Sequence, residues 1–198
     1  TFDSTPKGNI GPAADAAMEF LGVSYTVLCP ALPVNGRVVM KGELYVGGVP
    51  LHESPMKNHP LTPMWDARIA NLMKPQSKYS CVELWKEQMD RPADEIRAIL
   101  SDQADTQEHY YVIPDYQDME DGERIVELFG DLALLTGGSG ILEPLAKHLS
   151  RRQDILPELD IRAEGAAVLI AGSCSRATLE QIAHFQTHGG FSYKMDPM

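Results

Sequence analysis

The densest group of chemically capable residues lies near the start of the chain, in residues 3–11, DSTPKGNIG. Gly8 and Gly11 would let the backbone approach a ligand closely, and an expected helix start just after them would offer unpaired N–H groups. With the ammonium group of Lys7, this stretch suits a carboxylate or a phosphate. An ordinary capped helix start with a solvated lysine explains the same residues about equally well. The stretch does not have the Walker A spacing. Further polar contacts would come from Asp3, for sugar hydroxyls, and from Ser4, Thr5 and Asn9.

A second glycine-rich stretch, TGGSG, occupies residues 136–140 between an expected strand and an expected helix. Such glycines form either an anion cradle or a tight crossing of the chain, and the spacing alone favours the crossing. The GxGxxG pattern of dinucleotide-binding proteins is absent, which disfavours an oxidoreductase of the Rossmann type.

A third stretch, GSCSRAT, covers residues 172–178 at the end of another expected strand. Ser173 and Ser175 would present hydroxyls there, and Arg176 could contact a phosphate. Thr178 and Gln181 fit a capping box, which explains the threonine without a ligand. Cys174 has no assignable base, so packing is favoured over a nucleophilic role.

Histidines occur in two places where metal binding has to be considered. His52 and His59 lie in a proline-rich stretch whose spacing matches no zinc site, so hydrogen-bonded loop histidines are favoured. His184 and His188 lie four residues apart on an expected helix but lack the glutamate of an HExxH motif, which favours a surface face. We therefore expect no metal-ligating residues.

The charge balance excludes some function classes. The 198 residues carry 17 Lys and Arg against 28 Asp and Glu, a net charge of −11. We expect no general binding to nucleic acid or to anionic membranes. Apolar runs such as 166–172 are too short for a transmembrane helix, and three scattered cysteines do not indicate a disulfide scaffold. A cytoplasmic protein is expected, with homo-oligomerisation left open.

Apolar runs alternate with glycine loops and amphipathic segments, and this order predicts an α/β fold. The strands are continuously apolar, as in sheets covered on both faces. We expect a three-layer, doubly wound, mostly parallel sheet, with an inserted β-hairpin (37–40 and 43–47) and a proline-rich loop (51–63). The strands are expected at 24–29, 81–85 (strand or helix start), 109–113, 132–135, 167–171 and, as the start of one more, 191–195. The helices are expected at 13–21, 66–73, 92–101, 118–129, 141–149 and 176–188.

Several blocks of the sequence resemble the four-carbon acid sugar kinase family, and its 3-oxo-tetronate kinase branch in particular. The blocks cover much of the chain in the family's order, and the block at 29–64 is the most specific. Two departures are the YVIPDY strand end at 111–116 and a start at Thr1 that lacks the family's opening strand and acidic loop, which predicts an internal segment of a longer chain. The blocks are TFDSTPKGNIGP (1–12), CPALPVNGRVVMKGELYVGGVPLHES (29–54), MKNHPLTPM (56–64), LLTGGSG (134–140) and AGSCSRATLEQI (171–182).

The resemblance implies an ATP- and Mg²⁺-dependent kinase that phosphorylates the 4-hydroxyl of a 3-oxo-tetronate. Residues 1–150 would form an acid-sugar-binding domain, incomplete at its N-terminus, and 151–198 a linker and the start of a nucleotide-binding domain. Ser173 and Ser175, of which Ser175 is preferred, would contact ATP. Arg37 and His59 match motif positions without an assigned role. The sugar acid would be lined by Asp3, Ser4, Lys7, Gly8 and Asn9, with Asp3 the candidate catalytic carboxylate. The alternative hypothesis is a sugar- or nucleotide-binding α/β module without catalysis.

Overall fold

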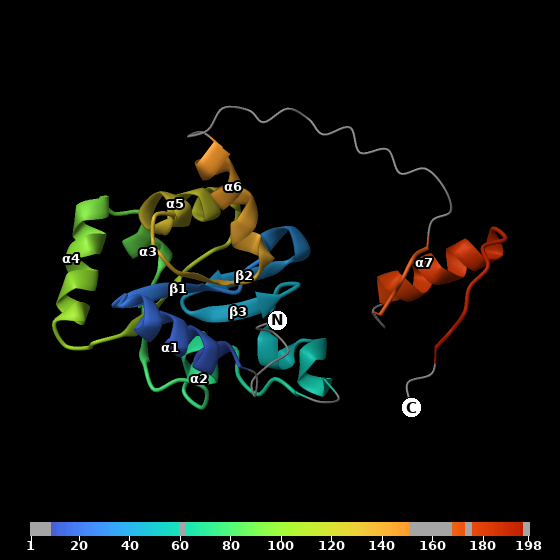
Figure 1. The fold of residues 1–198 in the computed structure, drawn as a ribbon, viewed down its shortest axis with the longest axis horizontal. Coiled ribbons are helices and arrows are strands. Elements are labelled where there is room, and N and C mark those ends of the chain that lie inside the picture. The colour runs from blue at the N-terminus through green and yellow to red at the C-terminus, as the bar shows by residue number, and fades with distance from the viewer. Residues whose placement is uncertain (1–8, 60–61, 151–167, 173–175, 196–198) are drawn as a thin grey trace. The chain divides into compact units, whose positions relative to one another are not determined.

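The structure is a computed structural model, and it describes residues 9–59, 62–150, 168–172 and 176–195. The chain divides into two compact units, Thr1–Ile155 and Leu156–Met198. Figure 1 shows the first unit as a layered α/β body and the second as a helix with extended flanks. In the described ranges every helix is too short or too polar to cross a lipid bilayer.

The first unit is built on a four-stranded parallel sheet in the order β5-β6-β1-β7. The strands are β1 (Tyr25–Cys29), β5 (Ser80–Leu84), β6 (Tyr110–Pro114) and β7 (Leu135–Gly137). All five residues of β6 are buried, because neighbouring strands flank it and side chains cover both of its faces. This strand forms the centre of the hydrophobic core.

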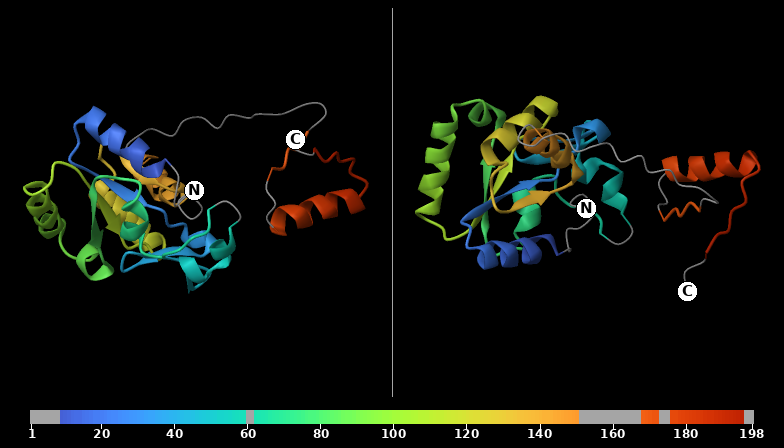
Figure 2. Two further views of the ribbon diagram at one scale, coloured as in Figure 1. Left: turned by 90° about the horizontal axis from the view of Figure 1, so that it is seen from below. Right: turned by 45° about the horizontal axis from the view of Figure 1, so that its top comes forward.

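Helices cover the sheet on both sides. Figure 1 shows α1 (Ile10–Leu21) and α2 (Ile69–Met73) below it, and α5 (Met119–Phe129) and α6 (Leu142–Ser150) above it. The helices α3 (Lys86–Met89) and α4 (Ala93–Ala104) connect β5 to β6. All views place α4 at one end of the unit and the short helices η3 (Leu51–Glu53) and η4 (Pro55–Asn58) at the other (Figure 2).

A separate antiparallel sheet is inserted between β1 and β5. Its strands are β2 (Arg37–Met40), β3 (Glu43–Val46) and β4 (Val49–Pro50), and a 3-10 turn η2 (Pro33–Asn35) precedes them. Reciprocal backbone hydrogen bonds of 3.0 and 2.9 Å join Val39 of β2 to Tyr116, just beyond β6. The inserted hairpin is therefore fastened to the main sheet at the end of its central strand.

These features confirm the predicted α/β class, the parallel sheet and the inserted hairpin. Three details of the first unit differ from the prediction. The strand predicted at 132–135 is formed at Leu135–Gly137, where it pairs with Val27–Cys29, and the helix predicted at 66–73 begins only at Ile69. A third strand, β4, continues the hairpin, because glycines at 47 and 48 take positive φ values of 61° and 83° and turn the chain back.

The second unit contains α7 (Arg176–Thr187), close to the helix predicted at 176–188. The strands predicted at 167–171 and 191–195 are not formed at the described residues 168–172 and 191–195. The side chains of Val168, Leu169 and Ile170 are 84 to 90% exposed. A strand needs a neighbouring strand to receive its backbone hydrogen bonds, and none is paired with this segment among the described residues.

Candidate functional site

The four parallel strands end at one common edge, and the segments that follow them form the candidate site. Ligands of open α/β sheets bind beyond this carboxyl edge. The segments are Pro30–Ala31 after β1, Trp85–Lys86 after β5, Asp115–Tyr116 after β6 and Gly138–Gly140 after β7.

The start of α1 lies at the same edge, because α1 runs back along the sheet and joins β1 through a short turn at 22–24. Its N-cap residue, Asn9, is exposed and makes no capping hydrogen bond, and the first helical turn has no acidic residue. Gly22 ends the helix in the left-handed conformation. The helix start therefore retains the positive end of its dipole without a carboxylate in its own first turn.

Most of the predicted site residues lie outside the described residues. Of the proposed sugar-acid set, Asp3, Ser4, Lys7 and Gly8 lie outside, and only Asn9 is described. The proposed nucleotide-binding residues Ser173 and Ser175 also lie outside. Arg176 begins α7.

The carboxyl edge is organised around Asp115, a buried carboxylate directly after β6. Its Oδ1 accepts a hydrogen bond from the backbone N–H of Gly42 at 3.3 Å, and its Oδ2 accepts one from the N–H of Lys86 at 3.0 Å. The N–H of Lys41 also bonds to this carboxyl. One side chain therefore joins the β2–β3 turn, the central strand and the start of α3.

The turn that Asp115 holds is conformationally demanding. Lys41 has a φ of 52°, the one positive value among non-glycine residues in the described part of the chain, and Gly42 follows at 75°. Burial raises the pKa of the Asp115 carboxyl, while the backbone N–H groups of Lys41, Lys86 and Gly42 act in the opposite direction. Since both oxygens are already engaged, Asp115 acts as a structural acceptor at this edge.

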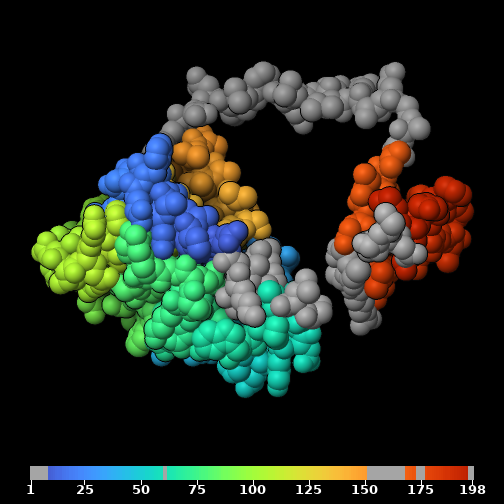
Figure 3. Space-filling view, turned by 60° about the horizontal axis from the view of Figure 1, so that its bottom comes forward, coloured from blue at the N-terminus to red at the C-terminus, as the bar shows by residue number. Residues whose placement is uncertain are grey.

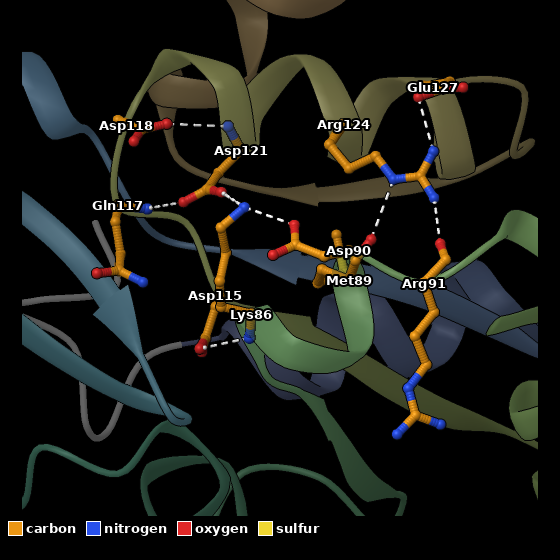
Figure 4. Close-up of polar contacts among 10 residues, drawn as sticks. All are labelled: Lys86, Met89, Asp90, Arg91, Asp115, Gln117, Asp118, Asp121, Arg124 and Glu127. Carbon is orange, nitrogen blue, oxygen red and sulfur yellow. Dashed lines mark hydrogen bonds and ion pairs between the residues drawn. The ribbon is translucent and has the colours of Figure 1, made fainter.

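A second polar network lies beside Asp115 and fastens α3 to α5 (Figure 4). The Nζ of Lys86 lies 2.9 Å from Oδ1 of Asp121 and 2.6 Å from Oδ1 of Asp90. These carboxylates raise the pKa of Lys86 above its usual range, and the ammonium stays charged. Asp121 also accepts from the N–H of Gln117 at 2.8 Å.

Arg124 extends the same network along α5. Its Nε and Nη2 donate to the backbone carbonyls of Met89 at 3.0 Å and Arg91 at 2.6 Å, and its Nη1 pairs with Glu127 at 2.8 Å (Figure 4). A groove of about 390 Å³ runs beside these residues. The cations in this network are already paired with chain carboxylates or carbonyls, which favours a structural role.

The TGGSG stretch forms the tight crossing that its spacing favoured. Gly137 has a φ of 157°, and a Cβ there would lie 2.3 Å from the carbonyl oxygen of Cys29. At Gly140 a Cβ would lie 2.0 Å from the carbonyl oxygen of Ala31, and the Gly140 carbonyl accepts from the Tyr116 hydroxyl at 2.8 Å. These two glycines are thus required by packing against the segment that follows β1.

Three of the four histidines considered for metal binding behave as loop or surface residues. At the fourth, His52, the buried Nδ1 has no hydrogen-bond partner among the described residues, so the hydrogen bond predicted there is not formed at this atom. Nδ1 of His59 lies 3.0 Å from the N–H of Thr62 and 2.9 Å from its hydroxyl, which confirms a hydrogen-bonded loop histidine. The ring of His184 on α7 and the ring of His188, just beyond the end of that helix, lie 4.1 Å apart, and both residues are exposed. Nδ1 of His188 is 2.8 Å from the carbonyl of His184.

The sequence analysis assigned no role to Asp115, Lys86, or Asp15 in α1. A signal existed for Asp115, because it directly follows a continuously apolar run in an α/β pattern, which is where polar residues of open sheets gather. No comparable signal marked Asp15 or the pairing of Lys86 with Asp121, because these partners lie far apart in the sequence.

Comparison with known proteins shows which family this chain belongs to. The family described as "Sugar-binding N-terminal domain" matches residues 1–145. The chain belongs to this family, the N-terminal domain of four-carbon acid sugar kinases.

The curated relatives are named 3-oxo-tetronate kinase. The protein from Brucella melitensis is 38% identical over 190 residues, which cover 94% of this chain and 43% of the relative. The protein from Escherichia coli K12 is 37% identical over 187 residues, with 94% and 48% covered. The chain therefore spans less than half the length of these relatives.

Solved structures share the fold. A Salmonella typhimurium LT2 protein, titled as a candidate tRNA synthase, superposes with a TM-score of 0.80 at 37% identity, covering 94% of this chain and 44% of that one. A Bordetella bronchiseptica protein, solved as a domain-swapped dimer with bound citrate, gives 0.59 at 28% identity, covering 94% and 43%.

The tight crossing at Gly140 predicts a selective loss of stability. Gly140→Ala should lower the free energy of unfolding by about 2 kcal/mol, because the new methyl group overlaps the Ala31 carbonyl. The matched control is Gly138→Ala, whose Cβ would lie 3.5 Å from the nearest atom and should cost about 0.5 kcal/mol or less. Urea unfolding followed by circular dichroism measures both, and equal losses would contradict the tight crossing.

Asp115→Ala should lower the free energy of unfolding by about 3 kcal/mol, because it leaves the buried N–H groups of Gly42 and Lys86 without their acceptor. Asp118→Ala is the control. It removes a carboxylate that caps α5 through the N–H of Asp121 at 3.1 Å and should cost about 1 kcal/mol. A loss at Asp115 no larger than that at Asp118 would show that the three elements do not depend on this carboxylate.

The loss of unfolding free energy in Asp115→Ala should depend on pH. The pKa of Asp115 is raised above its ordinary 3.8, so its stabilising contribution is complete below that pH and falls as the pH rises through the folded-state pKa. The difference in unfolding free energy between the wild type and Asp115→Ala should therefore be larger at pH 4 than at pH 7. If the difference in unfolding free energy instead grows towards neutral pH, the backbone hydrogen bonds lower the pKa of Asp115 by more than burial raises it.

Proposed function

We propose that this chain is the acid-sugar-binding part of an ATP-dependent kinase that transfers phosphate to the 4-hydroxyl of a 3-oxo-tetronate. The observation that carries the proposal is the family match over residues 1–145, together with kinase relatives about 38% identical across nearly the whole chain. Residues 1–150 form the sugar-acid domain in this proposal, and 151–198 the linker and the start of a nucleotide-binding domain.

The sugar acid would bind at the start of α1. Lys7 and the helix-start N–H groups would hold its carboxylate, since both present positive charge to an anion. Ser4, Gly8 and Asn9 would line the rest of the acid. The Bordetella bronchiseptica relative was solved with citrate, itself a hydroxycarboxylic acid, which supports binding of this ligand class.

Phosphate transfer of this kind depends on positioning and on charge stabilisation. Asp3 would orient or deprotonate the attacking hydroxyl. Ser173 and Ser175 would contact ATP, which would bring Mg²⁺ with its phosphate oxygens. Within the described ranges no three His, Cys, Asp or Glu side chains lie close enough together to hold a metal ion.

The test is ADP release by the complete protein that contains this chain, assayed with ATP, Mg²⁺ and a panel of 3-oxo-tetronates and tetronates. Turnover with a four-carbon acid supports the proposal. Binding of an acid without ADP release from any member of the panel would instead favour a non-catalytic binding module.

Lys7→Ala should raise KM for the acid by about tenfold or more, because one charge-assisted contact to the carboxylate is lost, and should leave KM for ATP unchanged. The control is Lys74→Ala, at an exposed lysine whose Nζ bonds to Asn71 at 3.2 Å, and it should change neither constant. Steady-state kinetics with each substrate varied separately measures the effect. An unchanged KM for the acid would remove Lys7 from the site.

Ser175→Ala should act on the other substrate. One hydrogen bond contributes about 1 kcal/mol, so loss of the hydroxyl should raise KM for ATP several-fold. KM for the acid should not change. The opposite pattern would move this serine from the nucleotide site to the acid site.

A further inference from the structure

A buried polar cluster ties the first half of α1 to the body of the first unit. The cluster consists of Asp15 on α1, Ser77 in the segment before β5, and Tyr111 on the central strand β6. The hydroxyl of Tyr111 donates to Oδ1 of Asp15, and the hydroxyl of Ser77 donates to the same oxygen at 2.7 Å. The N–H of Lys78 lies 3.4 Å from Oδ2. Asp15 is 8% exposed and Tyr111 is fully buried.

Steric contact blocks movement of α1 at the same place. A Cβ on Gly11 would lie 2.4 Å from the carbonyl oxygen of Gln76, so the helix is already as close to this segment as a glycine allows. The hydroxyl of Tyr111 also lies 3.4 Å from the Gly11 carbonyl. Figure 3 shows α1, in blue, directly beside the green part of the chain, to which the segment before β5 belongs.

Packing alone would not need this cluster. The buried Ala14 and Met18 already attach α1 to the core, and apolar contacts hold a helix without fixing its exact position. A buried carboxylate loses its hydration, and its hydrogen bonds are directional, so it defines one position and one rotation of the helix. The cluster acts on the helix turns that follow Asn9, and Asp15 lies within two turns of this end of the proposed acid site.

We propose that Asp15, Ser77 and Tyr111 are positioning residues for the sugar-acid site, which fix the start of α1 so that its N–H groups meet the carboxylate of the acid. This inference rests on the proposed function. Errors in placement well below 1 Å weaken such contacts, because hydrogen bonds to an anion depend steeply on distance and angle.

The test compares two tyrosines that follow each other on β6. Tyr111→Phe removes the hydroxyl that reaches α1. Tyr110→Phe removes an equally buried hydroxyl, which donates to the Leu100 carbonyl of α4 at 2.7 Å. Both variants keep the ring and should lose similar stability, so Tyr110→Phe is the matched control. Binding of sodium threonate and sodium erythronate is measured by calorimetry on the complete protein that contains the chain, and thermal unfolding is recorded in parallel.

Tyr111→Phe is expected to raise the Kd for the acid by roughly tenfold, while Tyr110→Phe leaves it unchanged at a comparable loss in Tm. Equal Kd values for the two variants overturn the inference and leave the proposed function standing. A wild-type protein that binds neither acid also overturns the inference, whereas the proposed function is tested separately by ADP release with the panel that includes the 3-oxo-tetronates.

Asp15 provides a second pair of variants with a built-in rescue. Asp15→Asn keeps an acceptor oxygen for Ser77 and Tyr111 and is expected to bind the acid within about threefold of the wild type. Asp15→Ala removes the acceptor and is expected to weaken binding at least as much as Tyr111→Phe. If Asn and Ala weaken binding equally, the hydrogen-bonded geometry does not position the site.

Discussion

The carboxylate of Asp115 is the constraint on which the architecture of the carboxyl edge depends. Among the strands that the structure describes, it follows the one that is buried along its whole length, and its two oxygens receive backbone N–H groups from two other elements. An amide side chain could not accept from both sides, since it offers only one acceptor oxygen. The inserted hairpin, the central strand and α3 therefore meet at a single carboxyl group.

This arrangement explains how an insertion can be part of the domain rather than an appendage. The Val39–Tyr116 hydrogen bonds extend the contact of Asp115 by one residue, and the Tyr116 hydroxyl reaches the Gly140 carbonyl in the loop after β7. The segments after β6 and β7 and the inserted sheet thus share one hydrogen-bonded set. Each of these bonds engages a backbone group on at least one side, so the side chains of Asp115 and Tyr116 fix the conformation of the main chain along this edge.

The features that could be predicted from the sequence are those that depend on local patterns of residues. Continuous apolar runs located the parallel strands, and the Lys41-Gly42 turn located the hairpin. The sequence could not predict that Asp115 accepts from Gly42, which lies 73 residues earlier, or that Asp15 faces Tyr111, 96 residues later. The strand expected at 132–135 shows the same limit. Its apolar residues fix a strand nearby, but pairing with β1 selects 135–137, where Gly137 passes close to Cys29.

The contrast between α7 and the apolar run before it follows from the same distinction between local and distant partners. A helix satisfies its backbone hydrogen bonds within its own segment, so α7 forms at the predicted residues. A strand can satisfy its own only against a neighbour, and Val168, Leu169 and Ile170 have no paired strand among the described residues. Their side chains are 84 to 90% exposed, and pairing with a neighbouring strand would satisfy the backbone of this segment and bury these apolar groups together.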